Sequence, residues 1–576
     1  MQIEILDILI IAAYFIFVTL IGLKYSGRAG QSIEEFFVSG RSLPWWLAGT
    51  SMVATTFAAD TPLAVTGLVA EHGIAGNWLW WNMVMSGLLT VFFYARLWRR
   101  AGILTDVEFT EIRYGGKPAA FLRGFRALYL ALPINSIIMG WVTLAMAKIV
   151  GTTTGMDKWP AVLICVGVTL IYSLLSGLWG VVVTDFFQFF IAMSGAVVLA
   201  VFAVDYAGGF DVLLEKLSRP ELGSGQILAF FPEIGSAWMP VSAVAVYLAV
   251  NWWATWYPGA EPGGGGYIAQ RIFSAKNEKH GIFATLWFNI AHYTIRPWPW
   301  IIVALVTLVV YPNLADKESG YVLMIIDALP PGLRGLLLAS FAAAFMSTIS
   351  TQLNWGSSYL VNDFYKRFIK KDGSPTHYVL VSRLATILIV IIGALTTMMM
   401  DSISGAWKFL MAIGAGTGLV YILRWYWWRI NAWSEISAMG ASLIISLVLQ
   451  TFFGLSSNDP EQFSILMIIT VTGSTFIWVL VTFLTDPEDE SLLVSFYERV
   501  KPAGRLWQKI YRKYHLELSK DSIGLSFRSW IIGIIFIYCF LFAAGNFFFG
   551  EFWIGIILLT ISVSCMVILW KELKKL

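Results

Sequence analysis

Apolar runs of about twenty residues recur along the whole chain, and short polar segments separate them. Because roughly 20 apolar residues in a helix cross a bilayer core, the pattern predicts an all-α polytopic membrane protein with about fifteen spans. We place these spans at residues 5–23, 44–70, 77–98, 125–149, 158–179, 181–206, 238–258, 281–311, 333–362, 378–400, 404–428, 432–454, 462–485, 529–550 and 552–570. The first run follows acidic Glu4 and Asp7 and precedes Lys24, the reverse of a secretory signal, so we expect it to remain as a membrane helix.

The distribution of Lys and Arg predicts the orientation, because positively charged loops stay in the cytoplasm. Most basic residues fall in alternate loops, around 24–41, 96–126, 271–279, 366–383, 424–429 and 501–520. This places the N-terminus outside and the C-terminal lysines inside. The longest polar segment, 486–528, is then cytoplasmic, and we expect a surface helix there whose charges face solvent or a partner.

Composition excludes several classes of protein. Hydrophobic residues make up 58% of the chain and charged residues 13%, about half the charged fraction of an ordinary globular protein. A soluble enzyme, a disordered scaffold and a secreted disulfide module are therefore ruled out. The net charge of +3 gives no basic field for nucleic acid, and the three cysteines lie in apolar runs as core thiols.

Two spans contain helix-breaking sequences. The span at 44–70 carries polar residues, Asp60 and Pro62 near its middle, and the span at 238–258 continues into a Pro- and Gly-rich stretch at 258–266. In lipid, such irregular backbone occurs where it is packed in protein or lines a cavity. Each interruption alone could be a kinked packing helix, but their matched placement indicates a transporter site at the two breaks.

The two interrupted spans also predict the domain organisation. Each opens a group of five spans, 44–206 and 238–430, and since five is odd the second group enters the membrane the opposite way. Residues 1–43 then form an extra N-terminal transmembrane helix and loop, and 207–237 an extracellular loop. Residues 431–576 form accessory C-terminal helices that include the cytoplasmic segment 486–528.

Ionisable side chains inside the membrane are costly and are functional candidates. Asp60 could contact an ion or solute, or cap the helix that resumes after the break. Asp185, alone, is typical of an acid at a helix N-terminus. Arg296 precedes a Pro-Trp-Pro sequence, where it could bind freed carbonyls or an anion. In the span at 333–362, small residues share one helix face, which is either packing surface or a source of hydroxyl and carbonyl ligands for a cation: Ala344, Ser347, Thr348 and Thr351, with Ser350 beside them.

At this point the chain resembles a known family. Ser42-Leu-Pro-Trp-Trp46, Ser176-Gly-Leu178 with Thr184-Asp185 and Gln188, Tyr267-Ile-Ala-Gln-Arg271 and Ala344-x-x-Ser-Thr348 occur in the order typical of it. The chain is similar, over residues 1 to about 485, to the sodium/solute symporters, which include bacterial sodium/galactose, sodium/proline and sodium/sialic acid transporters. The resemblance implies a LeuT-type inverted repeat of five plus five helices, with extra N- and C-terminal helices.

The resemblance also implies two sodium sites. The principal site would use the carbonyls of Ala54, Phe57 and Ala344 and the hydroxyls of Ser347 and Thr348. The second site, present in some members, would use Asp185, Ser347, Ser350 and Thr351. One or two co-transported Na⁺ ions are therefore expected.

For the solute, the resemblance implies contacts from both broken helices. The first presents Thr56, Asp60 and Thr61, and the second offers Trp252, Trp253 and Tyr257. Relatives carry a shorter segment before the Gln-Arg pair, so the Trp-Trp pair and the run to Gly266 are a departure from the family pattern. Asp60 suits a solute that carries a hydroxyl or ammonium group, whereas Arg296 suits a carboxylate, which leaves sugars, amino acids and organic acids open.

The sequence thus predicts a multi-pass plasma-membrane symporter that uses sodium to carry a small polar solute by alternating access. Lipid, sodium and the solute are its expected partners, without nucleic acid, and we expect a monomer while an oligomer stays open. The alternatives are a solute sensor on a transporter body and a polytopic membrane enzyme. The enzyme would need a catalytic cluster, and the five histidines are scattered.

Overall fold

The computed structural model describes residues 3–29, 38–173, 178–219, 226–255, 257 and 261–574. All regular structure in these ranges is helical, as the sequence predicts. Two features singled out above, Ser176-Gly177 and the start of the Pro- and Gly-rich stretch at 258–260, lie outside the described residues.

The described helices occur in this order along the chain. The first half of the chain contains α1 (Ile5–Ala29), α3 (Trp45–Thr56), α4 (Asp60–His72), α5 (Trp78–Trp81), α6 (Val84–Leu89), α7 (Ala95–Ala101), α8 (Phe109–Arg113), α9 (Gly116–Tyr129), α10 (Asn135–Thr154), α11 (Lys158–Ser173), α12 (Leu178–Tyr206), α13 (Phe210–Leu217), α14 (Val241–Val246), α15 (Trp252–Ala254), α16 (Gly266–Ser274) and α17 (Glu278–Ile290). The second half contains α18 (Pro297–Val310), η8 (Lys317–Ser319), α19 (Gly320–Ala328), α20 (Leu333–Ser358), η9 (Tyr359–Ile369), α21 (Pro375–Met398), α22 (Ile403–Gly414), α23 (Gly418–Tyr426), α24 (Ala432–Thr451), α25 (Pro460–Leu484), α26 (Glu490–Val500), α27 (Gln508–Lys513), α28 (Ile523–Phe548) and α29 (Phe552–Leu573).

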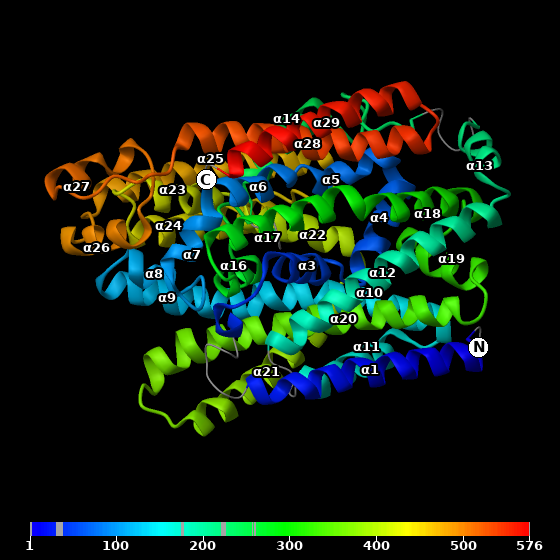
Figure 1. Cartoon of the computed structure of the whole chain (residues 1–576), viewed down its shortest axis with the longest axis horizontal. Helices are drawn as coiled ribbons and strands as arrows, with labels where there is room; N and C mark the ends of the chain where they lie inside the picture. Colours follow the sequence, from blue (N-terminus) through cyan, green and yellow to red (C-terminus); the bar gives the residue numbers. More distant parts are fainter. Residues whose placement is uncertain are drawn as a thin grey trace.

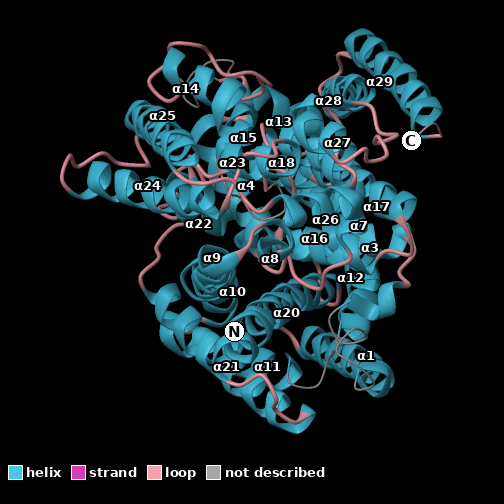
Figure 2. Cartoon of the chain, turned by 90° about the vertical axis from the view of Figure 1, so that its left-hand side faces the viewer, coloured by secondary structure: helices cyan, strands magenta, loops and turns pink. Residues whose placement is uncertain are grey.

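Most long helices run along the long axis of the molecule, with α28 and α29 at one edge and α1 and α21 at the opposite edge (Figures 1 and 2). Among the described residues, ten helices are long and apolar enough to cross a membrane, or up to twelve if two bent pairs each count as one span. The all-α membrane architecture is therefore confirmed. The count of fifteen spans, the outside N-terminus and the division into two repeats stay predictions.

The first predicted break is present. The axes of α3 and α4 differ by 56° across residues 57–59. The Thr56 hydroxyl donates to the Val53 carbonyl at 2.8 Å, and the Phe57 amide closes the last turn on Ala54 at 3.0 Å. Pro62, which has no N–H, occupies the third position of α4, where no intrahelical donor is required. The local sequence thus ends one helix and starts the next.

The second predicted break is present as well, and a third was not predicted. Regular helix ends at Ala254 and resumes at Gly266. The sequence predicts a continuous span over 404–428, but α22 and α23 are bent by 52° there. Gly416 has a φ of +93°, a conformation that favours glycine, and its amide donates to the Ala254 carbonyl at 3.0 Å. A backbone hydrogen bond therefore connects the second and third breaks.

Gly418 gives a test of this contact between breaks. A Cβ at this position would lie 1.9 Å from the Trp253 carbonyl oxygen, whereas a Cβ on Gly440 in α24 would meet nothing within 4 Å. We expect Gly418→Ala to lower stability by about 1–3 kcal/mol and Gly440→Ala to be neutral or slightly stabilising. Thermal unfolding of both purified variants measures the difference, and equal melting temperatures would contradict the contact.

The predicted surface helix in 486–528 is present as α26 and α27. Its apolar residues Leu493, Phe496 and Val500 are buried, and α26 packs on α7 and α8. These elements lie together with α9 at one end of the bundle (Figure 1). We call this the basic end, because the Arg- and Lys-rich loops after α7 and η9 lie there, and the other end the opposite end.

Candidate functional site

The end of α3 meets the middle of α20 at the first break. The Thr348 hydroxyl lies 3.0 Å from the carbonyl oxygens of both Thr55 and Ala344. Ala54 and Phe57 flank Thr55, Ser347 precedes Thr348, and all of them are buried. The structure therefore brings the residues expected for the principal sodium site to one junction, which we call the α3–α20 junction.

Asp185 lies beside this junction and is fully buried. The Ser347 hydroxyl donates to one of its carboxylate oxygens, and the Ser51 hydroxyl donates to the other at 2.6 Å. Its α12 backbone therefore brings an acid against α20, as expected for the second sodium site.

The other residues expected for that site have different partners. The Ser350 hydroxyl donates to the Ser347 carbonyl at 3.0 Å, and Thr351 accepts from Arg271 at 3.2 Å. Arg271 also donates to Ser51 at 3.3 Å. The positions of Ser51 and Arg271 beside Asp185 were not predicted, and they bring a guanidinium to the oxygens of the second site.

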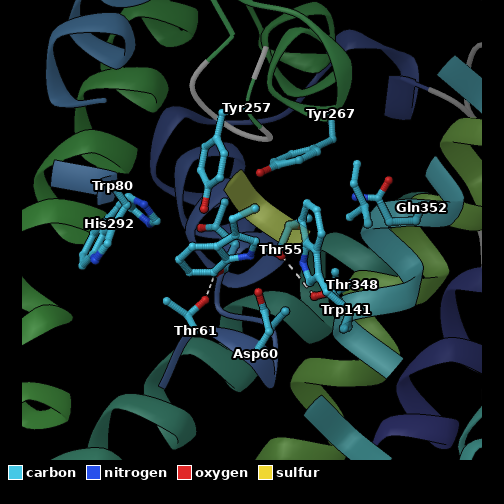
Figure 3. A pocket seen from close by; sticks show the side chains of 15 residues that line it. Thr55, Asp60, Thr61, Trp80, Trp141, Tyr257, Tyr267, His292, Thr348 and Gln352 are labelled. Carbon is cyan, nitrogen blue, oxygen red and sulfur yellow. Dashed lines mark hydrogen bonds between the residues drawn. The ribbon is translucent and has the colours of Figure 1, made fainter. Parts of the chain in front are cut away.

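A cavity of about 50 Å³ adjoins the junction. Thr55 and Thr348 line both. The remaining lining residues are Thr56, Ala58, Asp60, Thr61, Trp80, Ile138, Trp141, Val142, Tyr257, Tyr267, His292, Gln352 and Trp407. Asp60 and Tyr257 point into the same space from opposite sides (Figure 3). The cavity therefore combines aromatic rings with polar side chains.

The polar groups of the lining include both acceptors and donors, and Trp407 Nε1 is a buried donor without a partner among the described residues. The hydroxyls of Thr56 and Thr61 donate to backbone carbonyls, at 2.8 Å and 3.2 Å, so their free lone pairs can only accept. The Asp60 side chain is 4% exposed, and its Oδ1 has no partner among the described residues, as is true of Gln352 Oε1. A solute that fills this cavity would have to supply donors to Asp60 Oδ1 and Gln352 Oε1 and an acceptor to Trp407 Nε1.

Arg296 is fully buried but does not line the cavity. Its guanidinium donates to the carbonyls of Thr56 at 2.7 Å and Val53 at 3.3 Å. It lies 5.0 Å from the ring centre of Phe57 and 4.8 Å from that of Trp300. Of the two roles left open above, these contacts favour the structural one, in which Arg296 satisfies the last carbonyls of α3.

Of the three aromatic residues expected from the second break, only Tyr257 lines the cavity. The indole N–H groups of Trp252 and Trp253 donate to their own helix, at Leu248 and Ala249, and the Trp252 ring packs on Trp530. The sequence analysis did not identify the other cavity aromatics: Trp80, Trp141, Tyr267, His292 and Trp407.

Comparison with known proteins decides the family. The family model described as "Sodium:solute symporter family" matches residues 36–444. The chain belongs to the sodium:solute symporter family. The resemblance noted in the sequence is thereby confirmed: this symporter is a sodium-coupled, multi-pass membrane transporter rather than an enzyme.

Individual relatives agree along most of the chain. A protein named sodium/glucose cotransporter from Vibrio parahaemolyticus is 26% identical over 516 residues, covering 85% of this chain and 93% of the relative. Mouse solute carrier family 5 member 4B is 24% identical over 533 residues, covering 84% and 79%. A solved Na⁺-coupled sialic acid symporter, in a substrate-bound outward-open state, shares the fold with a TM-score of 0.67 at 18% identity, covering 84% of this chain and 99% of that structure.

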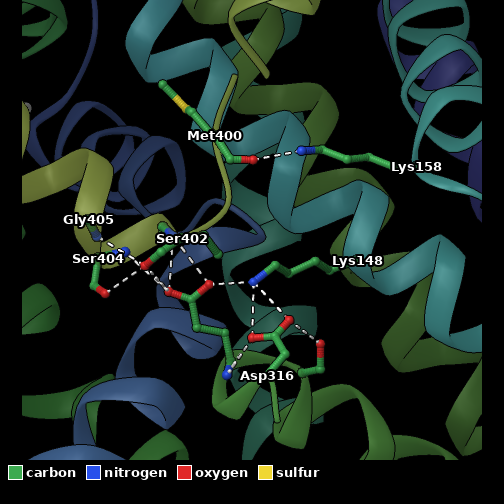
Figure 4. A network of polar contacts seen from close by, with 10 residues as sticks. Lys148, Lys158, Asp316, Met400, Ser402, Ser404 and Gly405 are labelled. Carbon is green, nitrogen blue, oxygen red and sulfur yellow. Dashed lines mark hydrogen bonds and ion pairs between the residues drawn. The ribbon is translucent and has the colours of Figure 1, made fainter. Parts of the chain in front are cut away.

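At the opposite end of the symporter, Glu318 joins several helices. Figure 4 shows Lys148, Asp316, Ser402 and Ser404, which belong to the same network. The Glu318 carboxylate accepts from the first amides of α22, at 3.0 Å from Ile403 and 3.2 Å from Ser404. Lys148 of α10 approaches it at 2.6 Å and approaches Asp316 at 2.9 Å. A Cβ on Gly67 of α4 would lie 2.9 Å from the Glu318 side chain. Glu318 therefore joins α4, α10 and α22, three helices that also contribute residues to the cavity lining.

In this network Lys148 forms ion pairs with two acidic side chains, one buried and one exposed. The Glu318 side chain is 7% exposed and that of Asp316 46%. We expect Glu318→Gln to lower stability by about 2–3 kcal/mol, because it weakens a buried ion pair and the cap of α22. The matched variant Asp316→Asn should change stability by less than about 1 kcal/mol. Thermal unfolding of both variants checks this, and a larger loss for Asp316→Asn would contradict it.

Proposed function

We propose that this symporter couples an inward sodium gradient to uptake of a small, uncharged, hydroxyl-bearing solute such as a sugar or polyol. The observation that carries this proposal is the set of unpartnered groups in the aromatic cavity beside the α3–α20 junction: the acceptors Asp60 Oδ1 and Gln352 Oε1 and the donor Trp407 Nε1. A hydroxyl group can serve both kinds. Hydroxyl groups would donate to Asp60 and Gln352, and the apolar ring face of a sugar would lie on the indoles. The name of the Vibrio relative is consistent with this class.

A carboxylate solute fits the cavity poorly. Arg296, the expected anion contact, has its NH1 and NH2 groups engaged by Thr56, Val53 and His292. An anion would instead face Asp60 and the lone pairs of Thr56 and Thr61. An ammonium group could bind Asp60 and the aromatic faces. One ammonium group could not also donate hydrogen bonds to Gln352 and the threonine oxygens. A polyol supplies one donor to each.

We propose one transported sodium, bound at Ala54, Phe57, Ala344, Ser347 and Thr348. The guanidinium of Arg271 donates to Thr351 and Ser51, so it occupies oxygens that a second sodium beside Asp185 would need. Asp185 then acts as a positioning residue. Its carboxylate accepts a hydrogen bond from the Ser347 hydroxyl, which leaves the lone pairs of that hydroxyl directed toward sodium.

One sodium supplies enough energy for useful accumulation. A charge that crosses about 100 mV gains about 2.3 kcal/mol, and a tenfold sodium gradient adds about 1.4 kcal/mol. The sum supports a solute gradient of roughly a few hundredfold. We place the basic end in the cytoplasm, so that sodium entering from the opposite end would hold α3 against α20 while the solute binds.

Uptake into proteoliposomes tests the function. We expect sodium-dependent uptake of compounds from a panel of hexoses and polyols, with a sodium Hill coefficient near one. Amines, amino acids and carboxylates at the same concentrations should not be accumulated. Preferred uptake of carboxylates or amines would refute the solute class, and a Hill coefficient near two would refute the single ion. Solute binding without net flux would instead favour the sensor.

A further inference from the structure

We propose that Asp106 and Glu261 form a proton-binding site between the solute cavity and the basic end, with the proton on Glu261. Glu261 is 7% exposed, and its carboxylate accepts no hydrogen bond from the residues that the structure describes. A Cβ on Gly265 would lie 1.6 Å from Glu261 Oε2 and 3.5 Å from Asp106 Oδ2. The two carboxylates therefore face each other across a glycine that leaves room for them.

The hydrogen bonds of the pair are unequal, and this assigns the proton. Asp106 accepts from the Gly266 amide at 3.3 Å and from the Tyr359 hydroxyl, and an Arg126 nitrogen lies 3.9 Å away. Donors of this kind stabilise an ionised carboxylate. Glu261 has no such donor, so a buried negative charge on it would be uncompensated and next to another anion. A proton on Glu261 removes both penalties.

The neighbouring cations do not neutralise Glu261. Its charged neighbours are Asp106, Arg126 and Arg424, and both arginines contact Glu435, at 3.2 Å and 3.3 Å. The cluster thus holds three carboxylates and two guanidinium groups. The tyrosines that face Glu261 are Tyr267, Tyr359 and Tyr421. On the far side of the cluster, Tyr114 donates to Glu435 at 2.6 Å, and Arg113 also faces Glu435.

The position of the pair connects it to transport. Tyr267 lines the cavity and interacts with Glu261. On α20 and η9, Gln352 lines the cavity, and Trp355, one turn further on, donates to Tyr359 at 2.6 Å, which in turn donates to Asp106. The pair therefore lies among the side chains that separate the cavity from the basic end, which we call the closure. Loss of the proton would leave two adjacent anions there and weaken the closure.

Infrared spectroscopy of the full-length protein in lipid tests the site without a solute. In sodium buffer near pH 7, where an ordinary carboxyl group is ionised, the wild-type protein should show the carbonyl stretch of a protonated carboxylic acid that Glu261→Gln lacks. The band should disappear as one titrating group when the pH is raised. The control Glu498→Gln, at an exposed acid of α26, should leave the band unchanged.

A wild-type spectrum without this band, or an undiminished band in Glu261→Gln, would overturn the proposal. Glu261→Asp serves as a second variant that keeps the acid, and its band should shift in frequency; a spectrum identical to wild type would also overturn the assignment. Binding of radioactive sodium to each variant, measured in parallel, reports on the proposed symport function. Failure of the proton site and failure of the sodium site are therefore distinguishable.

Discussion

Ser347→Ala is expected to raise the sodium concentration for half-maximal uptake by roughly tenfold to a hundredfold. The variant removes a hydroxyl that is proposed to bind sodium and that Asp185 holds in place at the α3–α20 junction. A hydrogen-bonding or ligand contact to a charge contributes about 1.5–3 kcal/mol, where about 1.4 kcal/mol is tenfold. Uptake measured against sodium concentration in proteoliposomes gives the shift directly.

Ser340→Ala is the matched control on the same helix. Ser340 is buried in α20, and its hydroxyl donates only to the Leu337 carbonyl at 2.8 Å. Sodium activation of this variant should equal that of the wild type. If Ser347→Ala showed unchanged sodium activation as well, the residues of α20 would not hold the ion.

Asp60→Asn is expected to raise the solute concentration for half-maximal uptake by roughly tenfold while sodium activation changes little. The substitution replaces a charged acceptor by a neutral one, and the difference between such hydrogen bonds is about 1–1.5 kcal/mol. Asp60 lies in the cavity wall, but no described contact connects its side chain to the α3–α20 junction. Uptake kinetics against solute concentration at saturating sodium measure the effect.

Glu71→Gln serves as the control for this charge change. Glu71 lies near the end of α4, and its side chain is 54% exposed, so both solute and sodium kinetics should match the wild type. Equal solute affinity in Asp60→Asn and the wild type would contradict the role of Asp60 in the cavity.

The helical architecture and the first two breaks could be predicted because their signals are local. Span-length apolar runs and the sequence from Thr55 to Pro62 carry their consequence within one or two helical turns. The break at Gly416 could not be predicted in this way. Gly416 occurs in an apolar run, and the carbonyl that satisfies its amide belongs to Ala254, far away in the sequence.

In the candidate site, too, some residues could be predicted from the sequence and others could not. The polar face of α20 and Asp185 could be singled out because ionisable and hydroxyl groups are costly in lipid. The family resemblance then implied which of these residues belong to the same sodium site. The aromatic wall could not be assigned, since the chain has 27 tryptophans and an indole suits lipid, packing or a cavity equally. Trp252 and Trp253 were expected at the cavity, yet their neighbours turn them elsewhere, whereas Trp80 and Trp141 line it.

The central claim is that the α3–α20 junction, where sodium is proposed to bind, controls the adjoining solute cavity through shared residues such as Thr55 and Thr348. Equilibrium binding of the best-transported hexose or polyol, measured across sodium concentrations in the wild type and in Ser347→Ala, tests it most directly. We expect solute affinity to rise with sodium concentration in the wild type, and we expect this rise to occur at higher sodium concentrations in the variant. Solute affinity independent of sodium in the wild type would contradict it.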